Sequence, residues 1–335
     1  GEMTATGSAK ATLNSVSGDQ AGRGIGISNE LNFGATGELD NGYSWMVRIE
    51  LDPASGTDTG LTDTDKYSGA ALNDDTAFEV TMGDLGMIGL YVSESGMNSK
   101  YGFDQSAYTA ITDTSVSEGI VYPNDLGSFN SIQYAIPAIL PLGITARVGH
   151  GVNGGATGEE GSSGNTVGAA AQDTMTAYQV SMAPIDGLKI GASYSEINTY
   201  SDGTTTDEQG EENGAYYVTY ATGPFSLGYG KSYKAPAVLD GVQSDTGAEY
   251  YDNTGVSFAY SVNDALSVSY THEKSEKNTF TANQSTIPDV KAKSVQAAYT
   301  VGGATISVAR TDYENKAYVT NDDATETLLA ISMAF

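Results

Sequence analysis

The sequence predicts an all-β chain that closes into a transmembrane antiparallel up-and-down β-barrel of 16 strands. Polar and apolar residues alternate through most of the chain, and tight turns alternate with long acidic loops. In addition, no segment approaches the roughly 18 consecutive apolar residues that a membrane-spanning helix needs. Residues 1–335 are expected to form this barrel as one domain.

The alternation has a period of two residues. In the segment 43–51 the odd positions are apolar and the even positions are mostly polar. The segments 255–262 and 266–271 alternate in the same way, with hydroxyl or small side chains on the second face. Successive side chains of a strand point to opposite faces, so one face suits lipid and the other suits water. Overall hydropathy stays low in such a barrel because only alternate residues meet lipid.

Short turns rich in Asn, Asp, Gly and Pro separate neighbouring strands. These residues either tolerate the positive φ of tight hairpins or preset the turn. Seven hairpins supply 14 strands, and end strands at about 2–15 and 325–335 bring the number to 16. The turns lie at 39–42, 83–86, 140–143, 184–187, 221–224, 262–265 and 301–304.

Longer acidic segments join the hairpins at the other end. An even number of strands with short turns at one end and long loops at the other is typical of bacterial outer-membrane barrels. A soluble β-sandwich would also alternate, but its connections would not be consistently long at one end. The long segments lie at about 16–22, 52–75, 94–127, 152–173, 199–212, 234–249, 275–289 and 315–323.

The charge balance excludes some functions. The chain has 15 Lys and Arg residues against 42 Asp and Glu residues, a net charge of -27. Nucleic acid is therefore not an expected partner, because phosphates need a basic surface. The chain has no cysteine, which excludes disulfides and Cys-based metal sites. The triplet 230–232 (GKS) lacks the context of a phosphate loop, and no nucleophile stands out beside either histidine, so no enzyme activity is expected.

Three segments resemble those of a known family. The alternating segment 328–335 ends on Phe335, like the C-terminal signal for barrel assembly, and 78–91 and 129–137 are similar to the strands flanking the third loop of porins. The chain thus resembles the general diffusion porins of the Gram-negative outer membrane, in particular their acidic alphaproteobacterial type. The resemblance implies a homotrimer in contact with membrane lipid and lipopolysaccharide. It also implies that residues 94–127, hereafter loop 3, fold into the barrel, and that the loop 52–75 reaches a neighbouring subunit.

The function that this implies is a passive pore for small hydrophilic solutes and ions. The acidic surplus predicts a preference for cations. Two alternatives remain open from the sequence. One is a substrate-selective outer-membrane channel, and the other is a non-conducting structural or adhesive surface barrel.

The alternation along each strand predicts which residues form the pore wall. Residues at odd and even positions point to opposite faces, and the face without the apolar residues points into the lumen. If Trp45, Val47 and Ile49 face lipid, then Arg48 and Glu50 face the lumen. A basic wall opposite an acidic loop 3 would set up a transverse field, although an inward Lys or Arg is often only solvated lumen surface. The candidate wall residues are Lys10, Arg48, Glu50, Arg147 and Lys189, and the candidate loop acids are Glu94, Asp104, Asp113, Glu118 and Asp125.

No cofactor is needed for passive diffusion. Hard divalent cations bind several oxygen ligands, so the acidic loops are candidate Ca²⁺ or Mg²⁺ sites, with Asp58, Asp63 and Asp65 as examples. A solvated acidic rim is the simpler reading of each cluster.

Overall fold

The structure is a computed structural model of the chain. The structure describes residues 1–18, 21–51, 75–92, 94–111, 116, 118–138, 140–152, 174–198, 207–239, 247–280 and 287–335. The predicted loops 52–75 and 152–173, with Asp58, Asp63 and Asp65, lie almost wholly outside these residues, and Asp113 lies outside them as well.

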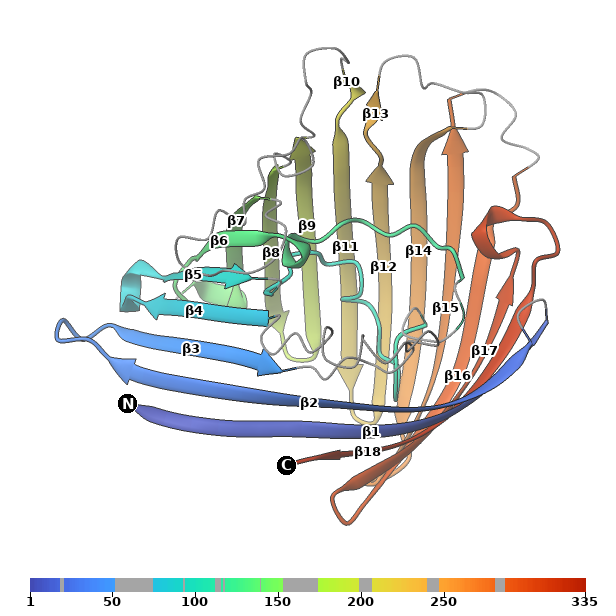
Figure 1. The fold of residues 1–335 in the computed structure, drawn as a ribbon, viewed down its shortest axis with the longest axis horizontal. Helices are drawn as coiled ribbons and strands as arrows, with labels where there is room; N and C mark the ends of the chain where they lie inside the picture. The colour runs from blue at the N-terminus through green and yellow to red at the C-terminus, as the bar shows by residue number, and fades with distance from the viewer. Residues whose placement is uncertain are drawn as a thin grey trace, which may run out of the picture.

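The fold is a closed antiparallel barrel of 16 strands, as predicted (Figure 1). Each strand pairs with its neighbour along the chain, and β1 closes the barrel by pairing with β18, for example Leu13 with Leu329. The barrel strands are β1 (Glu2–Gly18), β2 (Gly22–Glu38), β3 (Ser44–Leu51), β4 (Asp75–Thr81), β5 (Met87–Val92), β6 (Asn130–Ala135), β7 (Thr145–Val152), β8 (Thr174–Ile185), β9 (Leu188–Asn198), β11 (Glu211–Thr222), β12 (Phe225–Ala235), β14 (Ala248–Ser261), β15 (Leu266–Thr279), β16 (Val290–Val301), β17 (Ala304–Glu314) and β18 (Ala324–Ala334).

All seven predicted hairpin turns are confirmed, because each lies between two consecutive barrel strands. Two contain a single turn of 3-10 helix, η1 (Gly83–Leu85) and η3 (Pro141–Gly143). Gly187 shows why glycine is needed in such a turn. Its φ is +76°, and a Cβ there would lie 2.0 Å from the carbonyl oxygen of Ala221.

Several predicted loop boundaries were wrong, and two of them show the reason. The segment 16–22 was assigned to a loop, but β1 continues to Gly18 and β2 starts at Gly22. Likewise β15 continues to Thr279, through a charged segment assigned to the loop 275–289. Polar residues there pair in the ladder on both sides, as Ser275 does with Asn253 and Val290. In a water-filled barrel a polar strand end is therefore indistinguishable by composition from a loop.

A small second sheet was not predicted. β10 (Asp207–Gln209) and β13 (Val238–Leu239) pair antiparallel beyond the ends of the neighbouring barrel strands (Figure 1). Both come from segments assigned to loops. Two further 3-10 turns, η2 (Leu126–Ser128) and η6 (Lys316–Tyr318), lie in long connections.

The two faces of the barrel wall differ as the alternation predicts. Phe258 points outward and is 38% exposed, whereas its neighbour Ser257 points inward and is buried. Tyr194 and Tyr229 are likewise exposed on the outer face. Buried positions on the inner face include many polar residues, for example Gln296, so the interior is not a dry apolar core. Among the described residues, no helix has the length and hydropathy needed to cross a membrane.

Candidate functional site: the lumen and loop 3

Loop 3 lies inside the barrel, where its main chain is bound by polar side chains of the inner wall. The backbone N–H of Ser99 donates to Ser193 Oγ of β9 at 2.8 Å. Further along, the N–H of Ala107 donates to Ser269 Oγ of β15, also at 2.8 Å. Gln296 Oε1 of β16 accepts from the N–H groups of both Tyr108 and Thr109 at 3.0 Å. Figure 1 shows the same path, with the loop crossing the interior in front of β9 to β14. The predicted inward fold of this loop is therefore present in the structure.

Glycines in the wall make room for Phe103. A Cβ on Gly228 of β12 would lie 1.8 Å from the carbonyl oxygen of Phe103, and one on Gly255 of β14 would lie 2.1 Å from its ring. Phe103 itself is 3% exposed. Two adjacent strands thus expose backbone without side chains at these glycines, and Phe103 of loop 3 packs directly against it.

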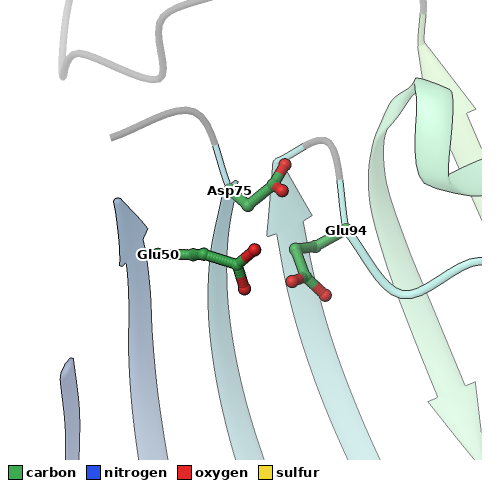
Figure 2. Close-up of side chains that lie close together, drawn as sticks. All are labelled: Glu50, Asp75 and Glu94. Atoms are coloured by element: carbon green, nitrogen blue, oxygen red, sulfur yellow. The ribbon is translucent and has the colours of Figure 1, made fainter. Parts of the chain in front are cut away.

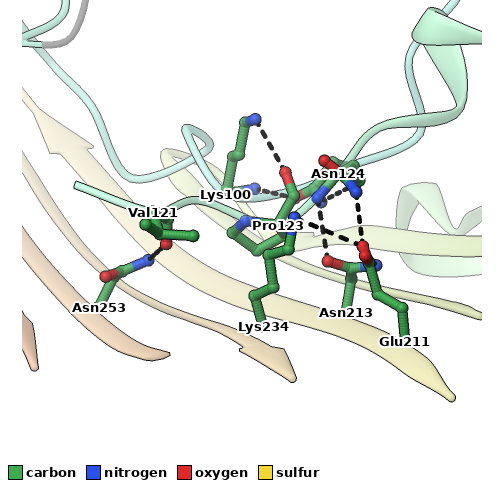
Figure 3. Close-up of polar contacts among 9 residues, drawn as sticks. Lys100, Val121, Pro123, Asn124, Glu211, Asn213, Lys234 and Asn253 are labelled. Carbon is green, nitrogen blue, oxygen red and sulfur yellow. Dashed lines mark hydrogen bonds and ion pairs between the residues drawn. The ribbon is translucent and has the colours of Figure 1, made fainter. Parts of the chain in front are cut away.

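The returning arm of loop 3 is held by a polar network with β11 and β12 (Figure 3). The Nζ of Lys100 donates to the carbonyl oxygen of Pro123 at 3.0 Å, which ties the two arms of the loop together. Asn124 Nδ2 donates to Glu211 Oε1 at 2.5 Å, and Lys234 Nζ lies 3.5 Å from the same oxygen. Burial lowers the pKa of Lys100, and the nearby Lys234 adds to the effect.

The last long connection also contacts loop 3. The N–H of Ala317 donates to the carbonyl oxygen of Glu118 at 2.9 Å. Tyr318 Oη lies 2.6 Å from Ser275 Oγ of β15 and accepts from the N–H of Val121 at 3.4 Å. Ala317 and Tyr318 both have positive φ, at 51° and 62°, a conformation that is unfavourable for non-glycine residues. The segment 316–318 therefore adopts a strained shape that brings it onto loop 3.

Three carboxylates meet where loop 3 leaves the wall (Figure 2). Oxygens of Glu50 on β3, Asp75 on β4 and Glu94 at the start of loop 3 all lie within 4.8 Å of one another. Arg48 forms an ion pair with Glu94, and its side chain is 39% exposed. The structure thus brings three predicted residues together, Arg48, Glu50 and Glu94. The fourth, Asp75, was assigned to the loop 52–75, although its register opposite Glu50 places it at the lumen.

The other predicted wall cations lie elsewhere on the inner face. Arg147 Nη2 donates to Ser95 Oγ at 2.5 Å and also to Gln133 Oε1, so Arg147 binds the base of loop 3. Lys189 Nζ is 5.9 Å from the ring centroid of Tyr217. Lys10 lies on β1, opposite Ser28 and Ser332.

The predicted loop acids serve mainly to shape the loop. Asp125 Oδ1 accepts from the N–H groups of Met97 and Asn98, at 2.6 and 3.1 Å. Asp104 Oδ1 accepts from Ser106 Oγ at 2.6 Å and lies 3.4 Å from wall hydroxyls of β14 and β15. Glu118 is only 9% exposed, and burial raises its pKa.

Within the described part of the chain, the two wall arginines do not form a free cationic row facing an acidic loop. Arg48 and Arg147 are both engaged by residues at the start of loop 3, whereas Glu50 and Asp75 add negative charge beside them. The result is a polar lumen, narrowed by an inward loop, with three carboxylates gathered at its wall. This arrangement is that of a polar channel narrowed by loop 3.

The sequence matches the family model of Gram-negative porins over residues 2–287, and the chain belongs to this family. No curated protein matches it significantly.

Solved porin structures share the whole fold. A porin structure refined at 1.8 Å has 15% identity and a TM-score of 0.66, with 100% of both chains covered. Salmonella typhi OmpF in complex with daunomycin has 12% identity and a TM-score of 0.67, covering 99% of this chain and 97% of that one. A variant of the Rh. blastica porin has 13% identity and a TM-score of 0.62, with full coverage of both. At such identities the likeness concerns the fold alone.

Proposed function

We propose that this porin is a passive pore in the outer membrane of a Gram-negative bacterium, admitting small hydrophilic solutes and ions with a preference for cations. The observation that carries the preference is the group of Glu50, Asp75 and Glu94 at the lumen wall, with Arg48 as its partner. Among the described residues, this group places three carboxylates and one guanidinium beside the path past loop 3.

Electrostatics gives the size of the effect. A unit charge about 5 Å from an ion in water contributes roughly 1 kcal/mol, and salt screens it further. Such a charge enriches cations severalfold at the narrow region and depletes anions, without binding either tightly. The polar inner wall favours hydrated solutes, since apolar ones gain nothing from displacing ordered water there.

Two partners follow from the same proposal. The barrel is proposed to lie among membrane lipids that include lipopolysaccharide, and three copies are proposed to assemble side by side. Support for assembly comes from the outer face of β1 and β2, where Ala5, Ala9 and Ala11 leave a flat surface beside highly exposed Ile25 and Ile27.

The test is single-channel recording in a planar bilayer, combined with reversal potentials in a KCl gradient. The wild type should give large ohmic steps and a potassium-to-chloride permeability ratio above one. The double variant Glu50→Gln/Asp75→Asn should lower that ratio by roughly twofold to tenfold, and Arg48→Gln should raise it, because each neutralises charge at the lumen. Glu196→Gln/Glu212→Gln removes two outward-facing carboxylates as a matched control and should leave the ratio unchanged.

Each alternative has its own signature. Steps blocked by one solute would favour a selective channel, and the absence of steps would favour a structural barrel. Anion preference in the wild type would overturn the charge argument.

A further inference from the structure

The connection between β17 and β18 folds back on itself at residues 315–323. The N–H of Asn315 donates to Asp323 Oδ1 at 2.9 Å, and the N–H of Lys316 donates to the carbonyl oxygen of Asp322 at 2.7 Å. The side chain of Lys316 is 2% exposed, and its Nζ lies 2.8 Å from Asp322 Oδ1. A buried charge is costly unless it is paired, so this ion pair favours the folded-back shape. The segment is therefore a compact unit with its two ends joined.

The backbone of this segment is strained. Four of its non-glycine residues have positive φ, which are Asn315 at 54°, Ala317 at 51°, Tyr318 at 62° and Asn321 at 63°. Asn tolerates this left-handed conformation, whereas Ala and Tyr adopt it only at a cost. Such strain persists where surrounding contacts require it. The contacts of Ala317 and Tyr318 therefore indicate what the shape is for.

Ala317 contacts the returning arm of loop 3, residues 118–124. Its N–H donates to the carbonyl oxygen of Glu118 at 2.9 Å. The next residue of the arm, Gly119, has a φ of +70°, and a Cβ there would lie 2.6 Å from the Cα of Ala317. The two main chains thus touch at a position where only glycine fits.

Tyr318 links the same arm to the barrel wall. Its Oη lies 2.6 Å from Ser275 Oγ of β15 and accepts from the N–H of Val121 at 3.4 Å. Its ring packs on Tyr251 of β14, with 5.5 Å between the ring centroids. The carbonyl oxygen of Val121 in turn accepts from Asn253 Nδ2 at 2.9 Å. Val121 is therefore held on one side by the wall and on the other by Tyr318.

The two arms of loop 3 are held in different ways. In the outgoing arm, residues 94–109, backbone amides donate to wall side chains at distances from 2.8 to 3.0 Å, and these amides belong to Ser99, Gln105, Ala107, Tyr108 and Thr109. In the returning arm, the amide of Asn124 donates to Asn213 of the wall at 3.0 Å, whereas that of Val121 donates to Tyr318. The segment 315–323 thus supplies to the returning arm a contact that the wall itself supplies to the outgoing arm.

The open part of the lumen lies on the other side of loop 3. The wall behind the returning arm is covered, since Ser275 is 0% and Asn213 is 1% exposed. Inward positions on the first two strands, such as Ser8 of β1 and Ser28 of β2, are exposed. A returning arm that leaves the covered wall therefore moves into the open lumen and narrows it.

We propose that residues 315–323 position the returning arm of loop 3 and thereby fix the width of the open channel. Ala317 and Tyr318 are the positioning residues, and they hold the main chain of residues 118–121 against the wall while solutes pass on the far side of the loop. The effect on width rests on the proposed function, since it requires the barrel to conduct.

Hydrogen exchange on the folded barrel in detergent, resolved by residue, tests the positioning without any current. Tyr318→Phe removes the hydroxyl and keeps the ring. The N–H of Asn124, which is bonded to the wall and not to Tyr318, should then exchange roughly fivefold faster, because one lost hydrogen bond changes a local opening equilibrium by about this factor. The N–H of Ser99 in the outgoing arm should be unchanged. Tyr134→Phe is the matched control, since its hydroxyl donates to the carbonyl oxygen of Leu85 in a hairpin turn, and it should affect neither amide.

Single-channel recording tests the width. The wild type should hold one open level, whereas Tyr318→Phe and Gly119→Ala should fluctuate and spend roughly fivefold or more additional time at lower conductance. Gly302→Ala is the control for Gly119→Ala, because Gly302 has a similar φ of +58° but nothing within 4 Å of its Cβ position. It should hold one level like the wild type.

Each result has a separate meaning. Unchanged exchange of Asn124 in Tyr318→Phe would overturn the positioning role, even if Gly119→Ala failed to fold. Faster exchange with a single, unaltered conductance level would overturn the control of width. A wild type that never conducts would contradict the pore, while the exchange rates would still show whether residues 315–323 hold the arm.

Discussion

Glu118 is a carboxyl group buried where two loops meet inside the barrel. Its main-chain carbonyl accepts from Ala317, while its side chain is almost wholly removed from water. Desolvation disfavours the charged form and raises the pKa of Glu118. Tyr122 is also buried in this region, and its burial, together with the carboxylate of Glu273, raises the pKa of Tyr122. Its hydroxyl donates to Glu273 Oε2 at 2.6 Å.

This burial predicts a pH-dependent stability. A carboxyl whose folded pKa lies above its unfolded value of 4.5 stabilises the fold fully below that value, and the contribution is lost as the pH rises through the folded pKa. Glu118→Gln should therefore be more stable than the wild type at pH 8, with a difference that shrinks toward pH 4. Urea titration of folding into vesicles measures it. The control is Asp186→Asn in a hairpin turn, which should show no such trend, and a constant difference across pH would refute the argument.

The strand β12 illustrates how an element positions the loop. Its Gly228 lies against the main chain of Phe103, so a side chain at this position must push loop 3 off the wall. Gly228→Ala should destabilise the barrel by about 1–3 kcal/mol and change single-channel conductance. Gly214→Ala on β11 is the matched control, because a Cβ there meets only the Ser193 carbonyl at 4.0 Å. Unchanged conductance in Gly228→Ala would contradict the claim that Gly228 is needed to make room for Phe103.

At the scale of elements, alternation and turn residues predicted the strands well, because one face must meet lipid while the other meets water. The rule failed where the outer face of a strand is polar. Near the end of β1 the outward residues Ser15 and Ser17 are polar and the apolar Val16 points inward onto loop 3, which reverses the pattern, and β15 ends in charged residues after Glu273. The pair β10 and β13 was missed because neither segment alternates for long enough.

The whole molecule is predicted to be a trimer packed through β1 and β2. Ala9 points outward on the flat face of β1, and a bulky residue there would hold two barrels apart. Ala9→Trp should therefore run as a folded monomer in unboiled gels, where the wild type runs as a trimer. Ala192→Trp makes the same change on the outward face of β9 and should leave the trimer intact. Two variants with the same oligomeric state would argue against this interface.

The candidate site could be predicted only in part at this scale. Parity placed Arg48, Glu50 and Lys189 on the inner wall, because strand geometry determines which way they point. Parity could not pair Arg48 with Glu94 or Arg147 with Ser95. The path of loop 3 depends on tertiary contacts with strands as far as 202 residues away along the chain. The partners of Lys234 and Glu211 were missed for the same reason, since both lay in segments assigned to loops.

Loop 3 is fastened to Ser193, Ser269 and Gln296 mainly through its own backbone amides. Amides are the same in nearly every amino acid, so the attachment does not depend on which side chains the loop presents to passing solutes. Side chains of loop 3 that contact passing solutes can consequently be substituted one at a time, in evolution or by design. The barrel and the path of the loop then stay unchanged. In such a design, permeability and foldability evolve independently.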